Sequence, residues 1–265
     1  MQLTRRALVA LGLAAVAACE APRSNAGGAP PRKDPMKKKI LLVLTSHAEL
    51  GDTGKKTGAY LPEIAHPYDV FTEAGLEVDF ASIRGGRAPL DGLDAKDESS
   101  KRFLADPAMQ ARLGETRALA DVDPAAYAAI FFAGGHGTMW DFPKDAAIGR
   151  VAGAIFEAGG VVAAVCHGPA ALLAIQTGGA PLVRGKKVAA FTNAEEEAVG
   201  LTKVVPFLLA DALTAQGAQH EGAPNFEAKV VSDGRLVTGQ NPASAKPVAE
   251  AVVGILLAGA IAPSP

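Results

Sequence analysis

Short apolar runs alternate with amphipathic stretches along most of this chain, and this alternation predicts an α/β domain. Consecutive small or branched apolar residues are typical of strands buried on both faces of a parallel sheet. Strands are predicted at 39–46, 77–86, 129–133, 161–165 and 182–192. Helices are predicted at 59–75, 144–157, 203–217 and 244–260. We therefore expect a doubly wound, mostly parallel sheet sandwiched by helices, as in flavodoxin-like folds.

Two further segments add to this plan. The segment 225–242 predicts a hairpin, because Asp233-Gly234 is a favoured two-residue turn between strand-like stretches. Residues 88–128 are irregular and polar at first and then helical. We interpret them as a lid-like excursion from a single domain that spans residues 39–258.

The first 38 residues follow a different pattern, which predicts export. The basic pair Arg5-Arg6 precedes an apolar run through Ala18, too short to span a bilayer comfortably. Residues 1–18 thus resemble a lipoprotein or twin-arginine signal, with Cys19 as the lipidated residue and 19–38 as a flexible tether. We expect a membrane-anchored lipoprotein facing the periplasm or cell exterior, or otherwise a periplasmic protein. An ordinary cleaved secretory peptide is the alternative.

Composition narrows the classes of partner. A chain of 265 residues that is 49% hydrophobic can bury one sizeable α/β core. Its formal net charge of −2 gives no sign of the basic face that nucleic acid requires. Two cysteines argue against a disulfide scaffold. The apolar stretch of the C-terminal helix is too short for a membrane span, so we expect membrane contact by the lipid anchor only.

The residues around Cys166 suggest nucleophilic chemistry. The strand-like run 161–165 leads into Cys166-His167-Gly168-Pro169 and then into an apolar run that predicts a helix. This order is typical of a nucleophile elbow, with cysteine in place of serine. A helix N-terminus beside the sulfur should lower the pKa of the thiol and favour the thiolate. The alternative is a small cysteine buried in the core.

Three predicted loops should converge near this cysteine, because sites in doubly wound sheets form at the carboxyl ends of the strands. They are GGHG at 134–137, the turn at Cys166 and the turn after Thr192. His136 either lines a pocket or satisfies backbone groups, and Trp140 either shapes the pocket or belongs to the core.

No metal site is expected from the histidine spacing. His47, His66 and His220 have neither the i,i+4 spacing nor the CxxC-type partners of metal sites. Structural roles are the simpler interpretation for these three.

Five motifs together resemble the ThiJ/PfpI superfamily, which has the class I glutamine-amidotransferase-like fold. The motifs are GAYLPEIAHPYDVF, FFAGGHGTMWDFP, AVCHGPAAL, FTNAEEEAVGLTKVVPFLL and DGRLVTGQNPASA. The GGHGTMWD stretch and the long insertion look most like the heat-shock chaperone and glutathione-independent glyoxalase III branch. The resemblance covers residues 39–257.

The resemblance implies roles for four side chains. Cys166 matches the family nucleophile, Glu63 the carboxyl group beside the thiol, and His167 the catalytic histidine. In the glyoxalase branch a later acid orients that histidine. An acid of the run 195–197 fits that position; we choose Glu196 and leave its two neighbours open.

The resemblance also implies a pocket around the sulfur. The backbone N–H groups of Gly135 and His167 would form an oxyanion hole, and Gly134, His136 and Trp140 would lie around it. Two anions at close range cannot both be ionised cheaply, so the pKa of Glu63 should rise beside a thiolate.

The implied activity is that of a glutathione-independent glyoxalase, also described as glyoxalase III or D-lactate dehydratase. Such an enzyme converts methylglyoxal and related 2-oxoaldehydes to 2-hydroxy acids without a cofactor, and the family usually forms homodimers. Two alternatives stay open. One is a holdase chaperone or protein deglycase of the same family, and the other is a cysteine amidase or peptidase.

Overall fold

A computed structural model describes residues 39–93 and 96–261 of the chain. The predicted signal, Cys19 and the tether lie outside the described residues.

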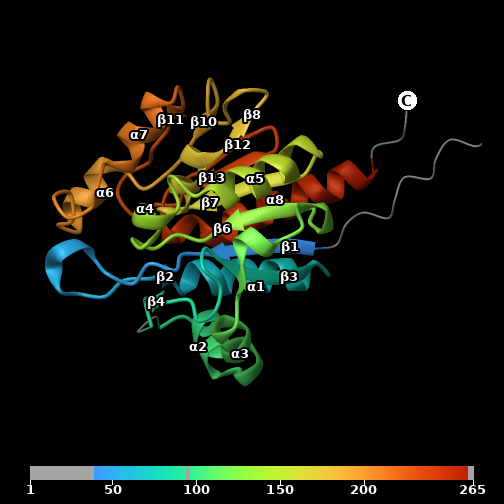
Figure 1. The fold of residues 1–265 in the computed structure, drawn as a ribbon, viewed down its shortest axis with the longest axis horizontal. Helices are drawn as coiled ribbons and strands as arrows, with labels where there is room; N and C mark the ends of the chain where they lie inside the picture. The colour runs from blue at the N-terminus through green and yellow to red at the C-terminus, as the bar shows by residue number, and fades with distance from the viewer. Residues whose placement is uncertain (1–38, 94–95, 262–265) are drawn as a thin grey trace, which may run out of the picture. The chain divides into compact units, whose positions relative to one another are not determined.

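A seven-stranded sheet forms the centre of the fold, in the order β12-β13-β7-β6-β1-β3-β5 (Figure 1). The strands are β1 (Lys39–Leu44), β3 (Glu77–Ser82), β5 (Arg117–Ala118), β6 (Ala129–Phe132), β7 (Val161–Val165), β12 (Val230–Asp233) and β13 (Leu236–Gly239). Every neighbouring pair is parallel except β12 with β13, which form the predicted hairpin. The mostly parallel sheet predicted from the sequence is therefore confirmed.

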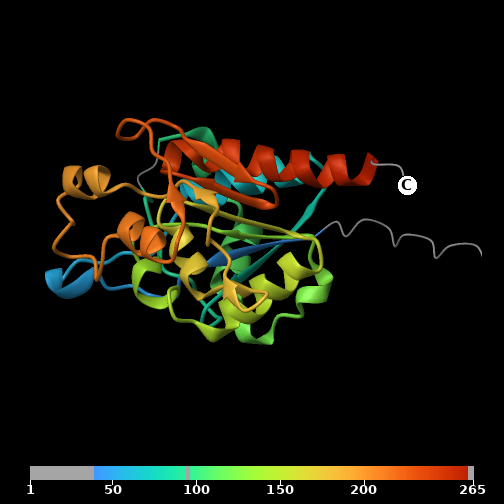
Figure 2. The same cartoon turned by 90° about the horizontal axis from the view of Figure 1, so that it is seen from above.

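Helices cover both faces of the sheet, which explains the continuous apolar runs. On β1, Leu41 and Val43 pack into the core beneath α5 (Ala146–Glu157) and α7 (Leu209–Ala215). Ile40, Leu42 and Leu44 point to the other face, toward α1 (Pro62–Glu73) and α8 (Ala245–Ile261). Figure 2 shows α8 along one side of the sheet and α5 along the other.

The predicted excursion contains β4 (Leu90–Asp91), α2 (Glu98–Ala105), α3 (Pro107–Gly114), β5, and the 3₁₀ turns η2 (Leu119–Asp121) and η3 (Pro124–Ala126). Phe103, Met109 and Leu113 bury their side chains in the core cluster that includes α1 and β3. The helical part thus packs against the body of the domain, and its role as a lid stays a prediction.

The remaining short elements connect these layers. They are η1 (Gly51–Thr53), β2 (Ala59–Tyr60), α4 (Thr138–Asp141), η4 (Gly168–Ala174), β8 (Gln176–Thr177), β9 (Ala180–Pro181), β10 (Lys187–Val188), α6 (Asn193–Ala198), β11 (Gln219–His220) and η5 (Pro242–Ser244). Among the described residues, no helix is both long enough and apolar enough to cross a membrane.

Three predicted elements differ from the structure. The run 182–192 contains only β10, which pairs with β11 outside the main sheet. The run is buried at 182–183 and 188–191, is exposed at Arg184, Gly185 and Lys187, and has no ladder partner in the main sheet. The Ala189 N–H donates to Thr238 Oγ1 at 2.8 Å instead. The helix predicted at 203–217 is shortened to α7, because Pro206 disfavours helical backbone in the residue before it. The helix predicted after Pro169 is the 3₁₀ turn η4.

Candidate active site

Cys166 occupies a strained turn between β7 and η4. Its φ of 61° lies in the left-handed region, which a residue with a side chain rarely adopts. Two backbone bonds hold it there: its N–H donates to Gly239 O at 2.9 Å, and Phe191 N–H donates to its carbonyl at 3.0 Å. The side chain is buried, with the residue only 4% exposed. The turn has the geometry of a nucleophile elbow.

A chain of three polar side chains starts at the sulfur. Cys166 Sγ lies 3.3 Å from His167 Nδ1, and His167 Nε2 lies 2.9 Å from Glu196 Oε2. Burial alone would raise the pKa of Glu196, but hydrogen bonds from His136 and His167 outweigh it and lower that pKa to about 2. Burial lowers the pKa of His167 to about 4, and the neighbouring His136 adds to this effect.

These protonation states fix the direction of each hydrogen bond near neutral pH. An ionised Glu196 can only accept, so a neutral His167 donates its Nε2–H to the carboxylate. Its Nδ1 then carries a lone pair that faces the Cys166 sulfur. The arrangement is a thiol, an imidazole that can take its proton, and a carboxylate that stabilises the resulting charge.

Glu63 approaches the same sulfur from the first turn of α1. Its Oε2 accepts the Gly134 N–H at 2.8 Å, while Oε1 is buried without a hydrogen-bond partner. Burial raises the pKa of Glu63 to about 8, against the opposing effect of bonds with Cys166 and Gly134. The pKa of Glu63 is raised, as expected, but burial is the cause, whereas the expectation rested on repulsion from a neighbouring thiolate.

The pKa of Cys166 itself moves opposite to the expectation. Burial raises the pKa of the thiol, and negative charge on Glu63 raises it further. The expected lowering assumed an α-helix N-terminus, whereas the sulfur stands at a seven-residue 3₁₀ turn inside the core. A neutral thiol beside a neutral carboxyl is therefore the resting state near pH 7.

The first two of the three glycines of the GGHG loop allow this close approach. A Cβ on Gly134 would lie 2.5 Å from Glu63 Oε2 and 2.9 Å from the backbone nitrogen of His167. Gly135 has a φ of +98°, and a Cβ there would lie 2.1 Å from Gly58 O. The backbone N–H groups of Gly135 and His167 both reach the sulfur and act to lower the pKa of the thiol. The donors expected for an oxyanion hole are thus beside Cys166.

The acidic run 195–197 divides its roles by geometry. Glu195 closes a capping box with Thr192 at the start of α6 and also binds the Phe226 N–H and Asn241. Glu197 is exposed. Glu196 is left to face His167. The pattern Thr192-x-x-Glu195 is a capping-box signature, so the sequence held a signal that separates Glu195 from Glu196.

Other predicted pocket residues have mixed positions. His136 joins the network, since its Nε2 lies 3.2 Å from Glu196 Oε1 and its ring centroid 4.2 Å from that of His167. Trp140 instead stacks on His47, with ring centroids 5.0 Å apart. Sequence analysis missed Phe191, whose ring lies 4.3 Å from that of His167 and holds one face of the imidazole.

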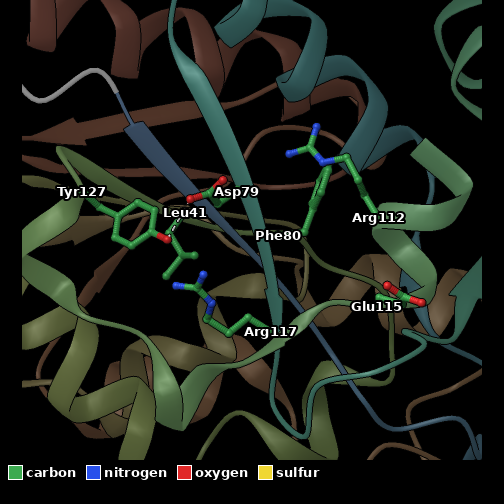
Figure 3. Close-up of a pocket in the computed structure, with 7 residues that line it drawn as sticks. All are labelled: Leu41, Asp79, Phe80, Arg112, Glu115, Arg117 and Tyr127. Atoms are coloured by element: carbon green, nitrogen blue, oxygen red, sulfur yellow. Dashed lines mark hydrogen bonds between the residues drawn. The ribbon is translucent and has the colours of Figure 1, made fainter. Parts of the chain in front are cut away.

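A separate cavity of about 410 Å³ lies away from these residues, beside β1, β3 and β5 (Figure 3). It is lined by Leu41, Asp79, Phe80, Arg112, Glu115, Arg117 and Tyr127. Tyr127 donates to Asp79 at 3.0 Å. The two arginines are balanced by two acids, so the cavity has no marked preference for ligands of one charge.

Comparison with known proteins gives consistent results. Residues 56–254 match the DJ-1/PfpI family. "Glyoxalase 3" of Candida albicans is 36% identical over 81% of this chain and 97% of its own length. "Glutathione-independent glyoxalase HSP31" of Saccharomyces cerevisiae is 35% identical over 78% of this chain and 93% of its own length.

Solved structures agree with these sequence matches. The crystal structure of glyoxalase III from Candida albicans superposes with a TM-score of 0.78 at 32% identity, covering 83% of this chain and 98% of that one. The Rapid Encystment Protein 24 KDa of Francisella tularensis gives a TM-score of 0.80 at 41% identity, covering 83% and 99%.

Proposed function

The chain belongs to the DJ-1/PfpI family, and from this premise we propose that it is a glutathione-independent glyoxalase. It would convert methylglyoxal and related 2-oxoaldehydes to 2-hydroxy acids. The observation that carries the proposal is the buried arrangement of Cys166, His167 and Glu196 with a neutral Glu63 beside the sulfur. Relatives that match over most of the chain are named as glyoxalases of this kind.

The reaction begins with addition of the Cys166 sulfur to the aldehyde carbon. As the S–C bond forms, His167 Nδ1 takes the thiol proton and Glu196 stabilises the imidazolium. The N–H groups of Gly135 and His167 stabilise the oxyanion, which then receives the proton to give a hemithioacetal. Because the thiol starts neutral, the thiolate forms only as the bond is made, and a low thiol pKa is not required.

The next step moves hydrogen between the two substrate carbons. His167, neutral again, removes the proton from C1 while Glu63 gives its proton to the oxygen on C2, which leaves an enediol. Return of a proton from His167 to C2, and of the C1 hydroxyl proton to Glu63, gives the thioester of lactate. Water then cleaves the thioester to lactate and free Cys166 thiol, so the net reaction is methylglyoxal plus water to lactate.

The burial of the site favours small substrates. Cys166 is only 4% exposed, so a folded or extended polypeptide would not reach the sulfur without movement of the surrounding loops. This disfavours the peptidase alternative. Large exposed apolar side chains stand at Leu93, Val199, Phe226 and Leu257, on four different segments, and give no specific support to a holdase.

The test is turnover of methylglyoxal without glutathione or added metal. The full chain carrying Cys19→Ala retains Cys166 as its only thiol, because the sequence has two cysteines. We expect loss of methylglyoxal with matching formation of lactate, and none when Cys166→Ala is added. Lactate formed equally by both proteins, or by neither, would refute the proposal.

We also propose export and lipidation at Cys19, supported by Arg5-Arg6 and the apolar run that ends before the cysteine. Labelling of the cell-expressed protein with radioactive palmitate tests this, because Cys19→Ala should abolish the label. A homodimer is a further proposal, and light scattering of the Cys19→Ala protein tests it.

A further inference from the structure

Three side chains beside the nucleophile form a compact cluster of metal-ligand type. His136, His167 and Glu196 each offer one ligand atom, and these atoms all lie within 4.8 Å of one another. They come from three different segments: the loop after β6, the elbow after β7, and α6. No local sequence spacing connects them, which is why the sequence predicts no metal site here.

The geometry is close to what a bound ion requires. Zn²⁺ binds imidazole nitrogen and carboxylate oxygen at about 2.0–2.2 Å, so two of its ligand atoms stand at most roughly 4.2 Å apart. In the cluster, the two Nε2 atoms already lie 2.9 Å and 3.2 Å from the two oxygens of Glu196. Small side-chain movements would suffice to open space for an ion.

The cluster is held in place by its surroundings. The capping box at Thr192 and Glu195 fixes the start of the helix that carries Glu196. His167 is fully buried and packs against the tilted ring of Phe191, whereas the His136 side chain is 19% exposed and leaves an approach from solvent. Such preorganisation lowers the cost of gathering ligands around an ion.

We propose that His136, His167 and Glu196 form a binding site for a divalent transition-metal ion such as Zn²⁺, and that its occupation reversibly inhibits the enzyme. Two imidazoles and one carboxylate select transition metals over Mg²⁺ and Ca²⁺, which prefer all-oxygen sites. Three protein ligands leave a coordination position for water.

Inhibition follows from the histidine tautomer. A metal ion on Nε2 of His167 displaces the proton that now points to Glu196. A neutral His167 must then carry its proton on Nδ1, the atom that faces Cys166 Sγ. It can no longer accept the thiol proton, so addition of the sulfur to the substrate is blocked.

A measurement of Zn²⁺ binding tests the site. The full chain carrying Cys19→Ala competes for Zn²⁺ with a chromogenic zinc indicator under reducing conditions. We expect one ion per chain. Adding His136→Gln should weaken binding on the order of 100-fold or more, because even outer-shell partners are worth 10–100-fold. Adding Cys166→Ala should leave binding within a few-fold, which separates this site from simple capture of zinc by the thiol.

His66→Gln is the matched control, because His66 also pairs with a carboxylate, Asp97, at 2.8 Å but lies outside the cluster. It should bind zinc like the parent. Circular dichroism checks that the His136→Gln protein is folded, and Glu196→Gln provides a second variant that should lose binding. The visible bands of Co²⁺ bound in place of Zn²⁺ should indicate nitrogen and oxygen ligands without sulfur.

The test of zinc binding does not depend on the proposed function, whereas the test of inhibition rests on it. Zn²⁺ should suppress lactate formation, a chelator should restore it, and equimolar Mg²⁺ should have no effect. Zinc binding that survives both His136→Gln and Glu196→Gln, or that disappears with Cys166→Ala, would overturn the site. Stoichiometric binding at the cluster with full activity would overturn the inhibition.

Discussion

Replacing Glu63 with glutamine tests whether the buried pair of Glu63 and Cys166 is neutral in the folded protein. The amide can accept the Gly134 N–H through its oxygen and donate through its nitrogen, so it imitates the neutral carboxyl group. The difference in stability between the two proteins should therefore change only over the pH range in which Glu63 is ionised in the unfolded chain and neutral in the folded protein.

The size and sign follow from the pKa shift. The pKa of Glu63 is raised by burial from 4.5 to about 8. An acid whose folded pKa is raised stabilises the fold fully below pH 4.5 and loses that contribution as the pH climbs toward 8. At about 1.36 kcal/mol per pH unit, the wild type should lose roughly 3 kcal/mol relative to Glu63→Gln between pH 4.5 and about pH 7, and roughly 5 kcal/mol by about pH 8.

Urea denaturation across this pH range measures the difference. Glu73→Gln is the matched control: it makes the same substitution at the end of the same helix, where the side chain is exposed and hydrated. Its difference from wild type should stay within about 0.5 kcal/mol at every pH. A Glu63→Gln difference that is equally flat would show that Glu63 is ionised in the folded protein, and the neutral-pair mechanism would be wrong.

Two further predictions concern the residues around the pair. Glu196→Gln should lower kcat by about 10²–10⁴-fold, because the His167 imidazolium loses its carboxylate. Glu195→Gln should instead lower the stability of the fold by about 1–2 kcal/mol, because it weakens the capping box of α6, and it should change kcat less than about tenfold. Steady-state kinetics and urea denaturation separate the two, and equal kinetic losses would contradict the division of roles. Gly135→Ala should destabilise the fold by at least about 3 kcal/mol, since its Cβ would meet Gly58 O at 2.1 Å, whereas Gly234→Ala, with φ +61° but open space, should cost only about 1 kcal/mol. Similar losses at the two glycines would contradict the close packing around the elbow.

The sheet could be predicted well because its signals are local. The runs of β6 and β7, and that of β1 after Lys39, are apolar at every position because helices cover both faces, and that requirement is visible in the sequence alone. The hairpin turn at Asp233-Gly234 is likewise a local signal. The run 182–192 was misjudged because its buried apolar residues, which lack a partner in the main sheet, look the same in the sequence as a strand.

The site was predictable only in part. The elbow has a local signature at Cys166, but an acid in the first turn of a helix is ordinarily solvated, so the place of Glu63 beside the thiol was expected only from the family resemblance. The raised thiol pKa and the link between His136 and Glu196 depend on contacts between segments far apart in the chain. Periodicity and spacing contain no information on such contacts.

Trapping the covalent intermediate tests the mechanism most directly. The full chain carrying Cys19→Ala would be mixed with methylglyoxal, quenched with acid during turnover, digested and examined by mass spectrometry. The mechanism predicts that the peptide containing Cys166 gains the mass of one methylglyoxal, and that hydroxylamine releases part of the adduct, as expected for a thioester. Lactate formation with no adduct on that peptide at any quench time would contradict a reaction through the Cys166 sulfur.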